Sequence, residues 1–458
     1  MASASKDLFP CPSKQILEKT FVGKKLSEVS TPAAVLDRAV VGRNCQQMLK
    51  ACKALNVGFR PHVKTHKTTE VTLLQLGEGV QDVKILVSTI AEAEHLSSTL
   101  HEFHRQGKSV NVLYGVPLPP SQVQRLADLR NLIGPYSISV IIDHPAQLQV
   151  STTFKEATGA PLQAFVKVDT GYHRAGLDYT TKSFGDLIKE ILQLQIDGFV
   201  VLAGFYSHDD DGLHAHGLHG DSQPRYILSV GATPTATSVE NMRFEGAPTS
   251  QEGLFNEAKA LIYEVNQHYA LELHAGVYPI LDMQQLATHA SPSAAPSNPA
   301  ISTDSSLKIS TADLALTILA EVISIYDERH SPEGGVVPEA LVAAGTLALG
   351  HDACKSYKGW GIVSNWGMKR ADQIEQNQEG RSGWQVGRIS QEHGILTEDT
   401  MISGTFTLPL TIGQKIRIWP NHACIAGAGY GWYLVVDSRL QGDRQEEIVD
   451  VWVRCRGW

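Results

Sequence analysis

The sequence predicts a closed α/β barrel of the (β/α)8 type followed by a second, mainly β domain, on the strength of three observations. Short apolar runs alternate with helix-like segments from about residue 32 to about residue 280, as in a parallel sheet with crossover helices. Beyond about residue 310 the apolar runs follow one another without intervening helices. No Gly-x-Gly-x-x-Gly opens a helix after a strand, which disfavours the competing open, doubly wound sheet.

Composition places the chain among folded proteins that bind small molecules. Its 458 residues, 42% hydrophobic and 19% charged, are enough for two or three domains. The net charge of −9 argues against a nucleic-acid or anionic-membrane partner, because either would be met by a basic face. The N-terminus has no apolar stretch of signal-peptide length, so a cytoplasmic location is the expectation. The six cysteines show no disulfide-framework spacing.

Three segments are predicted from residue pattern alone. Residues 1–30 are expected to pack on the β domain, residues 31–310 to form the barrel, and residues 311–458 to form the β domain. Within the barrel segment, the Ser/Pro/Ala-rich tract 287–306 is expected to be a disordered surface insertion. The runs predicted as barrel strands are 33–36, 83–87, 110–114, 138–142, 164–168 and 199–203, and those predicted for the β domain include 314–323, 341–345 and 448–453.

Lys64 is the position that most strongly indicates chemistry. It follows an extended-looking stretch in the basic run 60–67, which reads Arg-Pro-His-Val-Lys-Thr-His-Lys. Neighbouring cations and partial burial favour a free amine, the form that makes a Schiff base with an aldehyde such as pyridoxal phosphate. Barrel enzymes carry their chemistry at the C-terminal ends of strands, where Lys64, Asp169 and Tyr206 are expected to lie. The alternative is a solvated basic loop.

Two further segments could bind an anion. The apolar run at Ser229 breaks into a Gly/Thr turn, 231–235, whose backbone N–H groups and hydroxyls could hold a phosphate, although an ordinary turn has the same composition. In the segment 169–176, Arg174 could face an anion or a ring nitrogen, or could pair with Asp169.

His422 and Cys424 form a candidate zinc site. In an extended segment the i, i+2 spacing directs both side chains to the same face, so that imidazole and thiolate could share one Zn²⁺. Two protein ligands leave coordination positions for water or substrate, as a catalytic zinc requires. A chance His-x-Cys pair is the alternative.

Taken together and in order, these pieces resemble the eukaryotic D-serine dehydratase family, whose members have the alanine-racemase-like fold of pyridoxal phosphate enzymes. The resemblance runs over nearly the whole chain. The segments that carry it are Thr31-Pro32, 60–67, 169–176, 204–208, 231–235, 272–278, 392–394 and 420–424.

The resemblance implies a pyridoxal phosphate- and zinc-dependent lyase that converts D-serine to pyruvate and ammonia, and a homodimer. It implies that Lys64 is the Schiff-base lysine and Tyr206 lies against the pyridine nitrogen, with His422 and Cys424 as zinc ligands. The remaining cofactor-binding residues that it indicates are Gly231, Ala232 and Thr233 at the phosphate, together with Arg174 and Tyr278.

Other activities of related chemistry stay open. D-threonine aldolases look similar but carry a carboxylate in place of Cys424, which favours the dehydratase. A racemase, a non-catalytic pyridoxal phosphate carrier and a zinc hydrolase are the remaining alternatives.

The chain also departs from the family pattern. The His/Asp-rich stretch 208–220 lacks the family's usual Tyr, and is interpreted as a solvated loop rather than a second metal site. Ala275 and Val277 replace the usual Pro and Asn, and the roles of Glu392 and His393 are left open.

Overall fold

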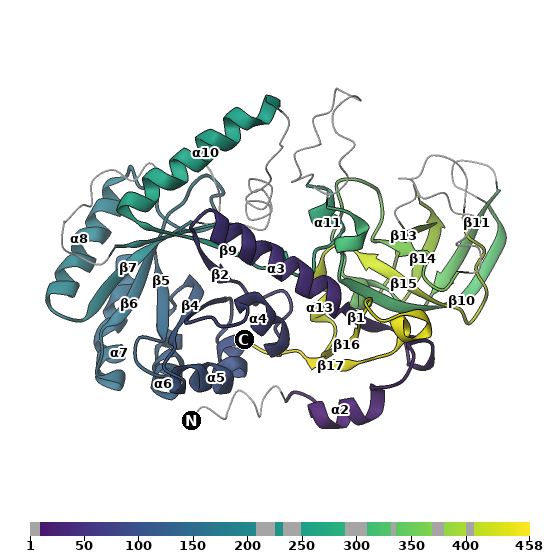
Figure 1. Cartoon of the computed structure of the whole chain (residues 1–458), viewed down its shortest axis with the longest axis horizontal. Helices are drawn as coiled ribbons and strands as arrows, with labels where there is room; N and C mark the ends of the chain where they lie inside the picture. Colours follow the sequence, from purple (N-terminus) through teal and green to yellow (C-terminus); the bar gives the residue numbers. More distant parts are fainter. Residues whose placement is uncertain are drawn as a thin grey trace.

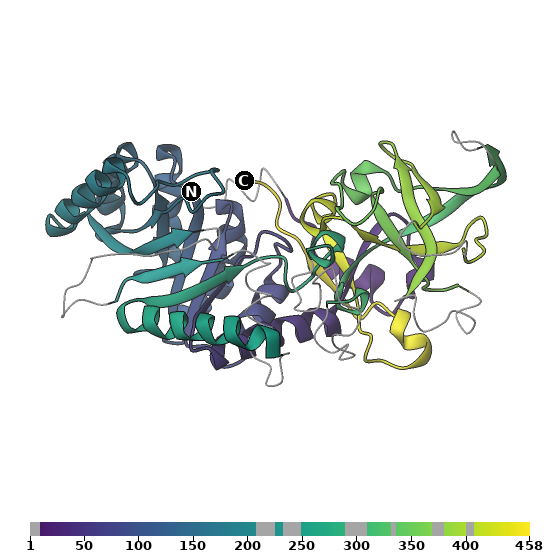
Figure 2. The same cartoon turned by 90° about the horizontal axis from the view of Figure 1, so that it is seen from above.

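The computed structural model describes residues 10–207, 225–231, 249–288, 309–330, 336–368, 380–399 and 407–458. Two sheets, one parallel and one mixed, lie end to end along the long axis of the molecule (Figures 1 and 2). The stretch 208–220 falls outside the described residues, as does the tract 287–306 apart from its first two residues.

The first sheet is an eight-stranded parallel barrel, which confirms the predicted fold class. Its strands run in the order β2-β9-β8-β7-β6-β5-β4-β3, and an isolated parallel bridge between His62 and Leu86 joins the two ends. The strands are β2 (Gly58–Pro61), β3 (Asp82–Val87), β4 (Ser109–Pro117), β5 (Ile138–Ile142), β6 (Leu162–Lys167), β7 (Val200–Ser207), β8 (Ile227–Val230) and β9 (Ala270–Ala275).

Crossover helices cover the outside of the barrel (Figure 1). Several begin at a hydroxyl or carboxylate that accepts a free backbone N–H of the first turn, as Asp37, Thr68, Thr89 and Thr181 do. The helices are α3 (Arg38–Ala54), α4 (Thr69–Leu76), α5 (Ile90–Arg105), α6 (Val123–Ile133), α7 (Ser151–Thr158), α8 (Lys182–Ile196) and α10 (Thr249–His268).

The second sheet is nine-stranded and mostly antiparallel, in the order β11-β14-β13-β12-β15-β10-β1-β16-β17. The β-rich character predicted for residues beyond 310 is therefore correct. Its strands are β1 (Ala33–Asp37), β10 (Leu316–His330), β11 (Val336–Val342), β12 (Gly361–Ser364), β13 (Arg381–Ile389), β14 (Gly394–Glu398), β15 (Lys415–Pro420), β16 (Trp432–Val436) and β17 (Asp450–Val453).

One predicted barrel strand was wrong, because the run 33–36 belongs to this second sheet. As β1 it pairs antiparallel with β10 and parallel with β16. A short apolar run shows that a strand is buried on both faces, but it carries no information about which sheet provides the neighbours.

The N-terminal segment packs on the second sheet. In α2 (Lys14–Phe21) and the following 3-10 turn (Leu26–Glu28), Leu17 and Leu26 join the apolar cluster that contains Leu434 and Val451. The short helices of this half of the molecule are α11 (Met283–Leu286), α12 (Thr346–Leu349) and α13 (Ala423–Ala428).

A continuous apolar core joins the two sheets. Leu273 and Ala275 of the barrel belong to the same cluster of buried side chains as Ile318 and Ile418 of the second sheet. The two sheets therefore meet along a packed interface, which fixes residues of the second sheet relative to one mouth of the barrel. No helix within the described ranges has the length and apolar character needed to cross a bilayer.

Candidate active site

Lys64 lies at the C-terminal mouth of the barrel, where the sequence predicts it. Strand β2 ends at Pro61, and the chain then forms a turn, residues 62–67, which we call the lysine loop. The backbone N–H of His62 donates to Ala275 O at 2.8 Å, and that of Val63 donates to Leu86 O at 3.1 Å. The loop is thus held on both sides by the neighbouring strands β9 and β3, and Lys64 is half-buried within it.

His66 anchors the lysine loop from within. Its side chain is fully buried; Nδ1 accepts the Thr68 N–H at 3.1 Å, which leaves Nε2 to donate to Gln75 Oε1 at 2.9 Å. Burial lowers the pKa of His66 to about 3, so this imidazole is neutral near pH 7. An uncharged ring with both nitrogens satisfied is a rigid support for the residues on either side.

The chain segment after β17 lies against the same loop. Buried Arg454 donates from Nη2 to Thr65 O at 3.5 Å and from Nε to the Tyr433 hydroxyl at 3.1 Å. The Cys455 N–H donates to Lys67 O at 2.8 Å. The second sheet thereby contributes directly to the position of the lysine loop.

Tyr206 and His274 form a stacked pair at the ends of β7 and β9. Their ring centroids are 4.3 Å apart and their planes 12° from parallel. Both side chains are buried, and burial raises the pKa of the Tyr206 phenol. The phenol therefore stays protonated and uncharged at neutral pH.

Gly231 follows β8 beside the same two residues. Its φ of +143° and its closeness to β9 both require glycine, because a Cβ there would lie 2.5 Å from His274 O. The absence of a side chain therefore lets the end of β8 pack closely against the backbone of β9. Ala232 and Thr233, also predicted to contact a phosphate, lie outside the described residues.

The segment after β6 places Arg174 near the same mouth. Asp169 accepts from His173, with Oδ2 2.9 Å from His173 Nδ1, whereas the Arg174 guanidinium lies 5.0 Å from the Tyr172 ring. A pair of Arg174 with Asp169 was one of the alternatives left open by the sequence, and the structure pairs Asp169 with His173. Sequence reasoning missed Lys167, a buried amine at the end of β6 that lies 5.1 Å from the Tyr206 ring centroid and whose pKa burial lowers.

Tyr278 lies beyond β9, close to the start of the lysine loop. It is buried and packs edge-on against Phe59, with ring centroids 5.5 Å apart. Glu392 and His393 occupy the exposed turn between β13 and β14, where Ser390 N–H donates to His393 O at 2.9 Å.

The candidate zinc ligands meet, although not in the extended segment that was predicted. Strand β15 ends at Pro420, His422 is the N-cap of α13, and Cys424 lies in its first turn. A hydrogen bond to Cys424 and the negative charges of Cys424, Asp282 and Asp352 raise the pKa of His422 to about 9 despite partial burial. As the N-cap, His422 still has an extended backbone, with φ −134° and ψ 105°, whereas Cys424 is already helical, so only part of the predicted extended segment is extended.

Cys424 contacts the lysine loop. Its Sγ lies 3.1 Å from Thr65 Oγ1, the residue directly after Lys64. No spacing in the sequence could have shown this contact, which spans 359 positions and joins the two sheets. One of the two predicted metal ligands therefore contacts the neighbour in sequence of the predicted Schiff-base lysine.

The donor set suits a zinc ion that is only partly held by protein. In the described part of the chain, no group of three or more His, Cys, Asp or Glu side chains is arranged to hold a metal. A thiolate and an imidazole are nevertheless good zinc ligands, and the remaining positions would go to water or substrate.

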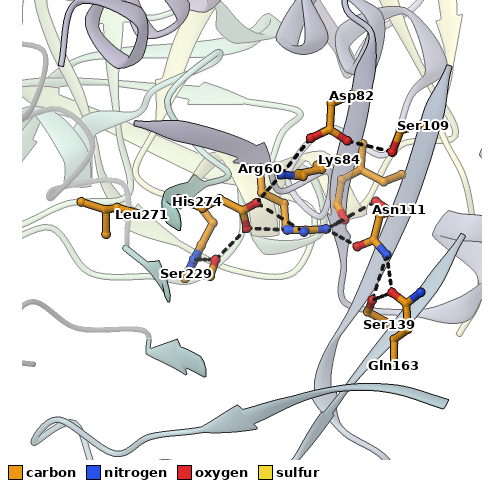
Figure 3. A network of polar contacts seen from close by, with 12 residues as sticks. Arg60, Asp82, Lys84, Ser109, Asn111, Ser139, Gln163, Ser229, Leu271 and His274 are labelled. Carbon is orange, nitrogen blue, oxygen red and sulfur yellow. Dashed lines mark hydrogen bonds and ion pairs between the residues drawn. The ribbon is translucent and has the colours of Figure 1, made fainter. Parts of the chain in front are cut away.

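A cavity of about 600 Å³ opens at the opposite, N-terminal mouth of the barrel. Its polar lining groups bond to one another, as Figure 3 shows: Lys84 pairs with Asp82 at 2.9 Å, and Asn111 donates to Ser139 Oγ at 2.8 Å. These groups therefore already have hydrogen-bond or ion-pair partners within the protein and do not need a ligand to supply them.

Comparison with known proteins agrees with this geometry. Residues 36–218 match the family described as "Alanine racemase, N-terminal domain", and residues 315–436 match "Putative serine dehydratase domain". The D-serine dehydratase of Schizosaccharomyces pombe is 33% identical, over 97% of this chain and 96% of that protein.

Two solved structures of D-threo-3-hydroxyaspartate dehydratase variants are also similar. A cysteine-to-alanine variant in the metal-free form is 26% identical with a TM-score of 0.64, and covers 95% of this chain and 100% of its own. A histidine-to-alanine variant is 25% identical with a TM-score of 0.65, and covers 97% and 99%.

Proposed function

The chain belongs to the D-serine dehydratase family, and from that premise we propose that it removes water from D-serine with pyridoxal phosphate and zinc. The family makes it a carbon–oxygen lyase. The α-proton and the β-hydroxyl leave as water, and the resulting enamine then consumes one water on hydrolysis to give pyruvate and ammonia. The observation that best supports the proposal is the contact between Cys424 and Thr65, the residue directly after Lys64.

The residues at the C-terminal mouth fit pyridoxal phosphate, which supplies an electron sink for charge that develops at the substrate α-carbon. Lys64 would hold its aldehyde carbon and take the α-proton, since the other amine of the lysine loop, Lys67, is paired with Glu92 at 3.0 Å. The backbone N–H groups of the turn that begins at Gly231 would bind its phosphate. Tyr206, whose phenol burial keeps protonated, would lie against the ring nitrogen of the cofactor without transferring its proton to that nitrogen.

His422 and Cys424 would hold Zn²⁺, which supplies a Lewis acid for the β-hydroxyl, a poor leaving group in water. In the two related variant structures the substituted histidine and cysteine are also two positions apart, and the cysteine variant is in a metal-free form. This spacing supports the assignment of His422 and Cys424 as ligands.

Substitution of the lysine tests the cofactor assignment. Lys64→Ala should lose the visible absorbance of bound pyridoxal phosphate together with ammonia release from D-serine. Lys50→Ala, on the exposed face of α3, is the control that should retain both. Full activity of Lys64→Ala would remove the catalytic assignment.

Metal analysis tests the zinc assignment separately. Cys424→Ala and His422→Ala should each reduce bound zinc from about one per chain to near zero while the cofactor absorbance stays. Cys354→Ala removes a neighbouring cysteine whose thiol donates to Met283 O, and should retain the metal. Undiminished zinc in both ligand variants would exclude this pair as the site.

A comparison of substrates separates the dehydratase from its relatives. D-serine, D-threo-3-hydroxyaspartate and D-threonine should be assayed for keto acid plus ammonia against glycine or aldehyde. Ammonia released fastest from D-serine supports the proposal, and formation of an aldehyde supports the aldolase alternative. The homodimer and the cytoplasmic location stay predictions, to be checked by light scattering and cell fractionation.

A further inference from the structure

A line of hydrogen bonds runs through the barrel interior from Arg60 to the ring that supports Tyr206. Building on the function proposed above, we propose that His274 is a positioning residue for Tyr206, held in its Nδ1–H tautomer by Glu272 acting through Ser229. Glu272, Ser229 and His274 have no assigned role in the reaction.

The line starts at a fully buried ion pair. Arg60 Nε lies 2.7 Å from Glu272 Oε1 and its Nη2 lies 3.3 Å from Oε2, so both oxygens of the carboxylate are engaged. Arg60 also donates from Nη1 to Asn111 Oδ1 at 2.8 Å. These bonds fix the carboxylate inside the barrel, where an unpaired charge would be strongly unfavourable.

The strand register brings the members of the line together. Tyr206 pairs with Ser229 across β7 and β8, and Ser229 pairs with Glu272 across β8 and β9. His274 lies two positions after Glu272 and so points to the same face of β9, and it pairs in turn with Arg60 of β2. All five side chains therefore project into the barrel from neighbouring strands.

Ser229 determines the tautomer of His274, because a hydroxyl has only one proton to donate. Ser229 Oγ lies 3.0 Å from Glu272 Oε1, which can only accept, so the hydroxyl proton points to the carboxylate. Ser229 Oγ also lies 3.1 Å from His274 Nδ1. With its proton committed, the oxygen must accept here, and His274 Nδ1 must carry a hydrogen.

The orientation of His274 passes to Tyr206 through the stack. The Nδ1–H bond fixes the rotation of the imidazole about its side chain, and the near-parallel ring of Tyr206 rests on it at 4.3 Å. Loss of that bond would let the imidazole turn or exchange tautomer, and the phenol would lose a fixed surface. Catalysis would then suffer more than substrate binding, because Tyr206 is proposed to face the cofactor rather than the substrate.

The barrel offers a matched control for a substitution of Ser229. Ser139 is also fully buried and also bridges polar side chains, Asn111 and Gln163, but it does not contact His274. Ser229→Ala and Ser139→Ala therefore remove the same hydroxyl from the same interior, and only the first removes the bond to His274.

The first measurement uses the cofactor-free protein. A long-range ¹H–¹⁵N spectrum of the histidine rings, with His274→Gln to identify the signals, should show the proton on Nδ1 in the wild type. In Ser229→Ala a mixture of tautomers or a shift to Nε2–H is expected, and in Ser139→Ala no change. A wild-type His274 protonated on Nε2 alone overturns the proposal, and does so even if Ser229→Ala fails to fold.

The second measurement uses the loaded enzyme. Ser229→Ala should lower kcat by about five- to tenfold, the factor that one lost hydrogen bond corresponds to, with KM changed less than about twofold. The absorbance band of the bound cofactor should also shift, which a purely structural role would not cause. Equal effects of Ser229→Ala and Ser139→Ala would overturn the proposal. A wild type that has the predicted tautomer but releases no ammonia from D-serine would instead contradict the proposed function.

Discussion

The two sheets bury different kinds of side chain. The interior of the barrel contains Arg60, Glu272, Lys84 and Asn111, joined by ion pairs and hydrogen bonds. The core of the nine-stranded sheet is built mainly from apolar side chains such as Ile318, which is fully buried, although this half of the molecule also encloses the ion pair of Arg381 with Asp399. Burial of aliphatic side chains stabilises the fold without fixing the orientation of any one side chain. A buried polar network does fix side-chain orientation, but it stabilises the fold only when every polar group has a partner. The barrel, whose lysine loop carries Lys64, is therefore the part of the molecule whose interior loses most stability when a single polar partner is removed.

The largest difference between the two interiors should appear when one charge is removed from the barrel. Glu272→Ala leaves Arg60 buried without its carboxylate, and should lower the free energy of unfolding by about 3–5 kcal/mol. Urea denaturation followed by circular dichroism measures this. A loss below about 1 kcal/mol would mean that water reaches Arg60 and that the interior is less dry than described.

A fall in pH should lower the free energy of unfolding through His66, the buried imidazole of the lysine loop. Its pKa is lowered from 6.5 to about 3 by burial, so below pH 6.5 the unfolded chain binds a proton that the folded chain does not. The stabilising contribution is complete above pH 6.5 and is lost as the pH falls towards 3, by about 3 kcal/mol between pH 7.5 and pH 4. His66→Gln should flatten the dependence of the urea midpoint on pH over this range, and an unchanged slope in this variant would contradict the assignment.

Replacement of both charged partners should remove most of the penalty seen with one. Arg60→Met combined with Glu272→Leu fills the same space without charge, and often proves near neutral for buried ion pairs. The residual loss should be about 1 kcal/mol, because Ser229 then lacks its acceptor. If the double variant unfolds as readily as Glu272→Ala, packing rather than charge holds this part of the barrel.

The smallest effect is expected in the second sheet. Ile318→Val removes one methylene from an aliphatic core and should cost about 1 kcal/mol, with no change in cofactor absorbance. Thermal unfolding and an absorbance spectrum check both parts. A large change in the spectrum would show that this core, too, controls orientation at the site.

The sequence was sufficient for the fold class and for most of the residues at the C-terminal mouth of the barrel. Lys64 and Tyr206 could be placed because a parallel strand always delivers its C-terminal end to the same mouth. The sequence could not predict which sheet β1 belongs to, nor the contact of Cys424 with Thr65, since both depend on residues hundreds of positions away. His274 lies in a segment that the sequence singles out, but its hydrogen bond to Ser229 is visible only when β8 and β9 are aligned.

The position of β1 has a consequence for synthesis on the ribosome. This strand is among the first segments to emerge, yet its partners β10 and β16 are translated only after the whole barrel. Until then the nascent chain carries an aliphatic strand with two open edges, which is a site for aggregation or chaperone capture. A fragment that begins after the barrel would lack the strand between β10 and β16, so the second half of this protein cannot be produced intact without its first forty residues.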